Sequence, residues 1–224
     1  MAQRFQRAAL VAAGLLAACA VHAQPAGSLI LRVGATDIAP DTKSGNLTAP
    51  SFAGTKASVA SDLQPTAGVT WMWSSNLSLD VPLAAGFTHD INGDGAISGV
   101  GKIGQVKALP ITVLAQYRFL AADSAVRPYL GIGPTYARFS DGRSTAALTA
   151  LTGGTPAKPT TLSVQSKWTF TAQVGLAWRL SPKWSIDTAV MKTPLKTRTT
   201  LSTGQTLDAT LDPTSVSVGV GYRF

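Results

Sequence analysis

The chain has 224 residues, of which 45% are hydrophobic and only 13% are charged, and its formal net charge is +8. Soluble globular domains usually contain about 25% charged residues, so this composition argues against an ordinary soluble enzyme. All acidic residues are aspartate, and glycine, serine and threonine are abundant. Because these residues are poor helix formers, the composition also argues against a mainly helical fold.

The first segment of the chain predicts an export signal. Two arginines precede an apolar run over residues 8–20, and a small-residue cleavage pattern ends at Ala23. The apolar run is shorter than the roughly 20 residues that a spanning helix needs. We therefore expect residues 1–23 to be a cleaved signal peptide and residues 24–224 to form the exported domain.

The single cysteine of the chain, Cys19, lies inside this signal. Residues 16–19 also fit a lipoprotein cleavage box, so lipidation of Cys19 is an alternative. The apolar residues Ala20 and Val21, with the second site at Ala23, favour ordinary cleavage. The exported domain then has no cysteine, which excludes disulfides and thiol catalysis.

Apolar residues alternate with polar or small residues along most of the exported domain, and this period of two predicts β-strands. The pattern occurs over residues 29–36, 63–73, 77–88, 109–119, 129–136, 168–180, 184–191 and 215–224. No segment after the signal resembles a spanning helix. An exported, apolar chain of this kind is either a secreted protein or a membrane β-barrel.

The connections between these runs alternate in length. Residues 74–76, 121–126 and 181–183 are short connections, whereas residues 39–61, 89–106, 139–167 and 192–213 are long. Short turns at one end and long loops at the other are typical of outer-membrane barrels. The sequence thus predicts an all-β fold, an eight-stranded antiparallel transmembrane β-barrel with short periplasmic turns and long extracellular loops.

The aromatic residues indicate which face of the strands contacts lipid. Those next to the short turns are Trp71, Trp73, Tyr117, Phe119, Trp178, Trp184, Tyr222 and Phe224, and a second belt is expected from Phe87, Tyr136, Trp168 and Phe170. Aromatic belts mark the two interfaces of a membrane. A soluble barrel would place its large apolar side chains inside and has no reason for such belts. We therefore expect the protein in the outer membrane.

The inward face of the predicted strands is charged near the short turns. Its charged members are Arg32, Asp80, Arg118, Arg179, Asp187 and Arg223. Charges inside a narrow barrel must pair, because unpaired burial is costly. We expect them to form a plug that closes the periplasmic half. The outer half is expected to be a funnel of small or apolar residues that includes Met72, Pro110, Leu114 and Met191.

The prolines within the predicted strands include Pro82, Pro110 and Pro134. Proline donates no hydrogen bond to the strand ladder, so these positions would weaken the wall and form a lateral opening. An apolar solute would then enter the funnel from outside and leave sideways. The alternative is that these residues only fill a closed structural barrel.

His89 is the only histidine after the predicted signal and is placed at the rim of the barrel. No serine nucleophile accompanies it in a recognisable constellation, so we expect no enzymatic activity, and we expect no metal or cofactor. The basic residues of the long connections are expected to face the anionic lipopolysaccharide, and we expect no nucleic-acid partner.

Several stretches resemble the OmpW family of outer-membrane proteins, which includes AlkL-type alkane importers. They are Leu31 to Ala35, Gly101 to Gly104, Arg127 to Gly133 and the C-terminal Tyr222, Arg223 and Phe224. The resemblance implies an eight-stranded barrel with a hydrophobic passage and lateral exit of small hydrophobic compounds into the membrane. The terminal residues look like the signal that the barrel-assembly machinery recognises. Residues 139–167 and 192–213 depart from the family pattern, since they are sparse in aromatic and large apolar groups.

Together these observations predict an outer-membrane barrel for passive uptake of small hydrophobic molecules. A second hypothesis is a structural or adhesion-type barrel, with a filled interior and loops that bind partners.

Overall fold

The computed structural model describes residues 26–224. The predicted signal peptide, residues 1–23, and the alternative lipidation site at Cys19 lie outside the described residues. Within the described part of the chain, no helix is both long and apolar enough to cross a membrane.

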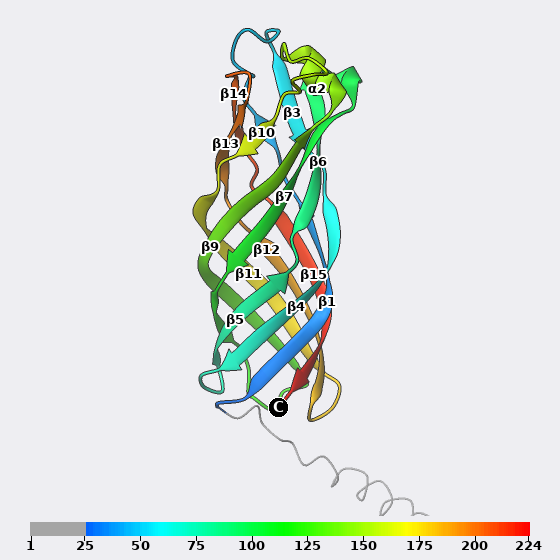
Figure 1. Cartoon of the computed structure of the whole chain (residues 1–224). Helices are drawn as coiled ribbons and strands as arrows, with labels where there is room; N and C mark the ends of the chain where they lie inside the picture. The colour runs from blue at the N-terminus through cyan, green and yellow to red at the C-terminus, as the bar shows by residue number, and fades with distance from the viewer. Residues whose placement is uncertain (1–25) are drawn as a thin grey trace, which may run out of the picture.

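The strands form a closed antiparallel barrel (Figure 1). Its wall consists of β1 (Leu29–Ala39), β4 (Asp62–Met72), β5 (Leu77–Ala84), β8 (Leu114–Arg118), β9 (Val126–Ser144), β11 (Lys167–Arg179), β12 (Trp184–Lys192) and β15 (Thr214–Arg223). Each strand pairs with the next in this order, and β1 pairs with β15 to close the circle. The predicted eight-stranded antiparallel barrel is therefore confirmed.

The long connections contain regular structure that the sequence did not predict, apart from residues 87–88 and 109–112, which belong to predicted strands. They hold β2 (Lys43–Ser44), β3 (Thr55–Val59), β6 (Phe87–Gly95), η1 (Ser98–Val100), β7 (Lys102–Thr112), α2 (Ala146–Leu151), β10 (Leu162–Val164), β13 (Lys196–Leu201) and β14 (Thr206–Thr210). Strands β3, β6 and β7 continue the barrel sheet, whereas β2, β10, β13 and β14 form a second sheet. The barrel thus continues upward as an extension at the end opposite the short turns (Figure 1).

An apolar cluster fills this extension. Its buried members are Ala57, Ile91, Ile97, Ile103, Val106, Leu148, Leu162, Leu201 and Leu207. Helix α2 contributes to it because Leu148 is buried while the Thr145 side chain accepts a hydrogen bond from the Leu148 amide, which caps the helix. On the outer surface, Arg198 donates two hydrogen bonds to Asp208 and lowers the pKa of that carboxyl group.

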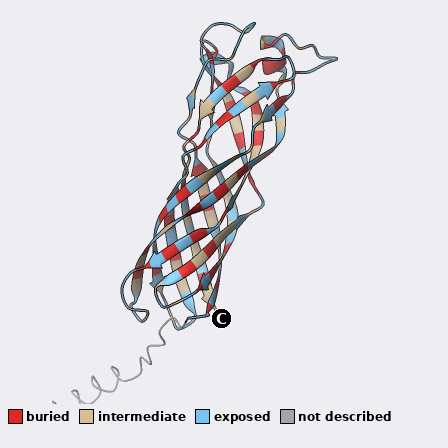
Figure 2. Cartoon of the chain, turned by 90° about the vertical axis from the view of Figure 1, so that its left-hand side faces the viewer, coloured by how far each residue is buried: buried red, intermediate tan, exposed pale blue. Residues whose placement is uncertain are grey.

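Exposed and buried residues alternate along the strands of the lower barrel (Figure 2), and large apolar residues are prominent among the exposed ones. Val33, Ile132 and Val218 are more than half exposed there, alternating with inward residues. At the short-turn end the aromatic rings pack in pairs, with 5.0 Å between the ring centroids of Tyr117 and Phe119. A fully exposed apolar face is stable only in lipid, so this band marks the membrane.

Phe87 is an exception to the predicted outer aromatic belt. Gly86, with a φ of +104°, separates β5 from β6 and shifts the alternation by one residue. Inward positions therefore change from Pro82 and Ala84 to Phe87 and His89, and Phe87 is only 2% exposed. The expectation from uninterrupted alternation over residues 77–88 was wrong here, because it assumed a single register through the glycine.

Candidate functional site

A network of paired charges lies inside the barrel near the short turns. Arg32 donates to both oxygens of Asp80, at 2.7 and 2.8 Å, and lies 3.3 Å from Asp187. The Thr70 hydroxyl donates to Asp80 at 2.6 Å, and the Tyr129 hydroxyl donates to Asp187 at 2.8 Å. Each carboxylate thus has a cation and a hydroxyl as partners, which compensates for its loss of water.

Arg118 is 1% exposed and extends this network across the barrel. We call the whole network of paired polar and charged side chains the floor. The Nε of Arg118 donates to Ser78 at 3.2 Å and its Nη2 to Gln116 at 2.9 Å. Its guanidinium carbon lies 4.7 Å from the centroid of the Tyr129 ring, within the range of a cation–π contact. Gln116 in turn donates to Gln173 at 2.8 Å, so the polar floor reaches from β5 to β11.

Two of the predicted plug residues lie apart from the floor. Arg179 donates to the carbonyl of Asp123, and Arg223 donates to the carbonyl of Pro182. Both therefore anchor the short turns. The predicted plug also omitted Tyr129, although its inward position in the alternation of residues 129–136 was a usable signal.

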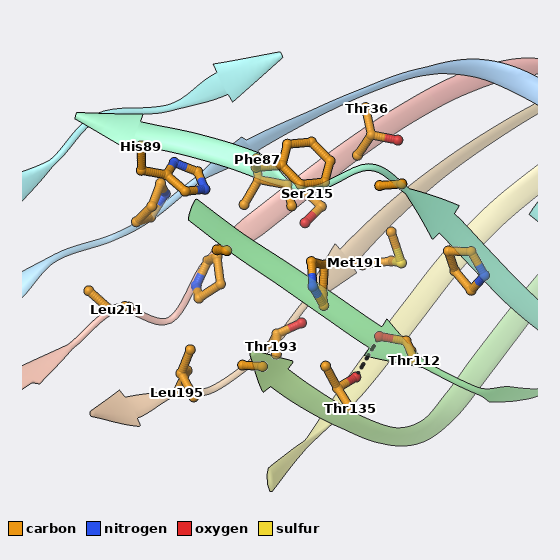
Figure 3. Close-up of a pocket in the computed structure, with 18 of the residues that line it drawn as sticks. Thr36, Phe87, His89, Thr112, Thr135, Met191, Thr193, Leu195, Leu211 and Ser215 are labelled. Carbon is orange, nitrogen blue, oxygen red and sulfur yellow. Dashed lines mark hydrogen bonds between the residues drawn. The ribbon is translucent and has the colours of Figure 1, made fainter. Parts of the chain in front are cut away.

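A cavity of about 170 Å³ lies above the floor (Figure 3). Apolar side chains contribute most of its lining: Ile38, Val59, Phe87, Ile91, Val106, Leu195, Leu207 and Leu211, together with Pro110 and Met191. The other two residues of the predicted funnel are buried at the level of the floor. Leu114 lies opposite Asp80, and Met72 lies opposite Ser78 beside a short turn.

Threonine hydroxyls form a chain across the inner part of the cavity wall. Thr112 and Thr135 lie 2.9 Å apart, Thr135 and Thr171 2.6 Å, and Thr171 and Thr193 2.8 Å. Figure 3 shows the first of these contacts. Each of these hydroxyls therefore has at least one hydrogen-bond partner within the wall.

His89 lines the cavity and is only 4% exposed, so it lies inside the barrel and not at an open rim as the sequence suggested. Its Nδ1 is 2.8 Å from the carbonyl oxygen of Ala60, and its ring stacks with Phe87 at 6.4 Å between centroids. Among the described residues, no group of three or more His, Cys, Asp or Glu side chains is placed to hold a metal ion.

The strand ladder of the wall is interrupted beside the cavity. Strand β5 pairs with β8 as far as Asp80 and Leu114, and pairing between β6 and β7 resumes at Phe87 and Ala108. Residues 81–86 and 109–113 face each other across this site. Each segment pairs with its other neighbour, β4 or β9, but no pairing between the two segments is found in the described structure, and we call them the wall gap.

Two of the three predicted prolines lie at the wall gap. Pro82 and Pro110 occupy its two sides, and both line the cavity. Pro134 lies outside it on β9, opposite Phe170, and its carbonyl accepts a hydrogen bond from the Val113 amide at 3.2 Å. Proline cannot donate to a ladder, so Pro82 and Pro110 disfavour pairing across the gap.

The chain is similar to known outer-membrane proteins along most of its length. It is 31% identical to outer membrane protein W of Salmonella typhimurium over 225 residues, covering 99% of this chain and 100% of that protein. It is 27% identical to outer membrane protein AlkL of Ectopseudomonas oleovorans, covering 75% and 68%. The crystal structure of OprG from Pseudomonas aeruginosa superimposes with a TM-score of 0.80 at 27% identity, covering 90% of this chain and 98% of that one.

A family model gives the same result. The model described as the OmpW family matches residues 25–224, which is the whole described barrel. The predicted resemblance and the predicted location are both confirmed. With its lipid-facing barrel, its aromatic belt and this match, the chain belongs to the OmpW family and is a protein of the outer membrane.

Proposed function

We propose that the barrel provides passive uptake of small hydrophobic molecules. A solute enters the apolar cavity from the extracellular side, is stopped by the charged floor, and leaves sideways through the wall gap into the membrane. The wall gap is the observation that carries this proposal, because both of its sides line the cavity and neither is paired to the other.

The floor supports sideways exit over passage along the barrel axis. Asp80 and Arg118 are at most 1% exposed, and their partners fill the interior at that level. An apolar solute on this path would have to displace paired charges from their partners, which is costly in a narrow lumen. The lining of the cavity, by contrast, is mainly apolar and matches such a solute. The cavity also weighs against the alternative of a structural barrel with a filled interior.

The test is to join the two sides of the wall gap. Leu83 and Ile111 lie on opposite sides, and both are nearly half exposed on the outer face. The double variant Leu83→Cys, Ile111→Cys, linked by a short thiol-reactive reagent, should reduce uptake of a radiolabelled alkane into liposomes to the level of empty liposomes. The mature chain offers no other thiol, since Cys19 lies in the predicted signal.

The matched control links Leu79→Cys to Ala115→Cys. These two residues already face each other in the paired part of β5 and β8, so the link should leave uptake unchanged. Equal uptake by the linked and unlinked wall-gap variants would rule out exit at this place. Uptake no faster than that of empty liposomes by the unmodified barrel would reject the proposed function altogether.

A further inference from the structure

One polar atom of His89, Nε2, lies at the apolar cavity without a hydrogen-bond partner among the described residues. The Nδ1 atom is 2.8 Å from the Ala60 carbonyl oxygen, which can only accept a hydrogen bond, so Nδ1 carries the proton. In the neutral imidazole, Nε2 is then a hydrogen-bond acceptor. No hydrogen bond to Nε2 is found among the described residues, although the side chain is 96% buried against the cavity.

The surroundings of this acceptor on His89 are mainly apolar. Phe87 stacks on the ring, and Ile91 and Val106 line the same part of the barrel. Figure 3 shows His89 toward the same end of the cavity as Leu195 and Leu211, away from Thr112 and Thr135. The threonine hydroxyls are already bonded to one another. A polar group that enters this end of the cavity therefore meets the Nε2 acceptor in a mainly apolar environment, where a hydrogen bond is strengthened. The Thr42 hydroxyl, which is buried without a hydrogen-bond partner, also lines the cavity.

We propose that His89 selects small hydrophobic molecules that carry a hydroxyl group, such as phenols and short alcohols, by accepting a hydrogen bond at Nε2. This inference rests on the proposed function, since it names the solute class of the same passage. The volume of about 170 Å³ suits a single aromatic ring, because a cavity of about 150 Å³ is known to hold benzene. The ring of the solute would occupy the apolar lining while its hydroxyl faces His89.

Comparing the affinities of phenol and anisole distinguishes a hydrogen bond to His89 from binding by hydrophobic contact alone. Both have one aromatic ring and one oxygen, but only phenol can donate a hydrogen bond. The barrel from residue 24 onward contains a single histidine, so ¹⁵N-histidine labelling gives the Nδ1 and Nε2 signals of one imidazole ring. In phospholipid nanodiscs, phenol should shift the Nε2 resonance and bind about fivefold more tightly than anisole.

Variants at the site test whether His89 causes the preference. His89→Leu should bring the affinity ratio of phenol to anisole close to one, whereas His89→Gln retains an acceptor and should preserve part of the preference. Thr88→Ala is the control, because Thr88 lies next to His89 on β6 but is exposed on the outer face, and it should leave the ratio unchanged. Heat-modifiable mobility in gels checks that each variant is folded.

Two results would overturn the inference. One is equal affinity of the wild-type barrel for phenol and anisole, and the other is an unchanged ratio in His89→Leu. These results are independent of the wall-gap experiment. If linking the wall gap blocks uptake while phenol shows no preference, only this inference fails. If phenol is preferred while the link leaves uptake unchanged, the proposed exit fails and the selective site remains.

Discussion

Asp80 illustrates how single residues make a charged interior possible. Its carboxylate is fully buried but accepts hydrogen bonds from Arg32 and Thr70. Arg32 also contacts Asp187, so the two acids share one cation. The floor is therefore a set of mutually dependent partners, and removal of one leaves another charge unpaired in the interior.

Asp80→Asn should lower the free energy of unfolding by about 3 kcal/mol, because it removes the main counter-charge of Arg32 at a buried site. The measurement is equilibrium unfolding in urea with the barrel inserted in lipid vesicles. Asp208→Asn makes the same chemical change at the exposed pair with Arg198 and should lower stability far less, because solvent screens that pair. Equal effects of the two variants would show that the floor contributes no special stability.

At the scale of the strands, the junction between β7 and β8 depends on a close approach to β9. A Cβ atom on Gly133 would lie 1.8 Å from the carbonyl oxygen of Val113, which is the residue between the two strands. Only glycine allows the backbones to come this near. This contact holds the strand on one side of the wall gap against its neighbour.

Gly133→Ala should therefore destabilise the barrel by about 1–3 kcal/mol, since the added methyl group must displace backbone. The temperature at which the heat-modifiable gel band changes mobility measures the effect. Gly99→Ala is the control, because a Cβ at Gly99 meets no atom within 4 Å. A Gly133→Ala barrel as heat-resistant as the control would contradict the steric argument.

For the whole molecule, the polar floor and the apolar cluster of the extension lie at opposite ends of one cavity. In the proposed mechanism the floor blocks the axial path to the periplasm, and the wall gap lies between the two ends. A barrel of this design should be a poor ion channel although it contains a cavity.

Single-channel recordings in planar bilayers should show no steady current for the unmodified barrel. The double variant Arg118→Ala, Tyr129→Ala removes two of the largest fully buried side chains of the floor and should produce a measurable conductance. Arg179→Ala alters only a turn contact, so this variant should show no conductance. A large steady current through the unmodified barrel would show that the floor does not close it.

Some features of this protein follow from the local pattern of residues. Alternation along the strands, with aromatics such as Trp71 and Tyr117 next to short turns, is enough to predict a membrane barrel, because side chains point to opposite faces with a period of two. The same pattern also placed Arg32, Asp80, Arg118 and Asp187 on the inward face. The sequence by itself thus determined the fold, the location and the inward charges.

Tertiary structure decided what the local pattern does not contain. The register shift at Gly86 turned Phe87 and His89 inward, and it depends on how β5 and β6 leave their partners. The extension also formed from segments without clean alternation, since its strands are stabilised by pairing with distant residues. The wall gap is likewise a relation between two strands, so it became visible only when their pairing partners were known.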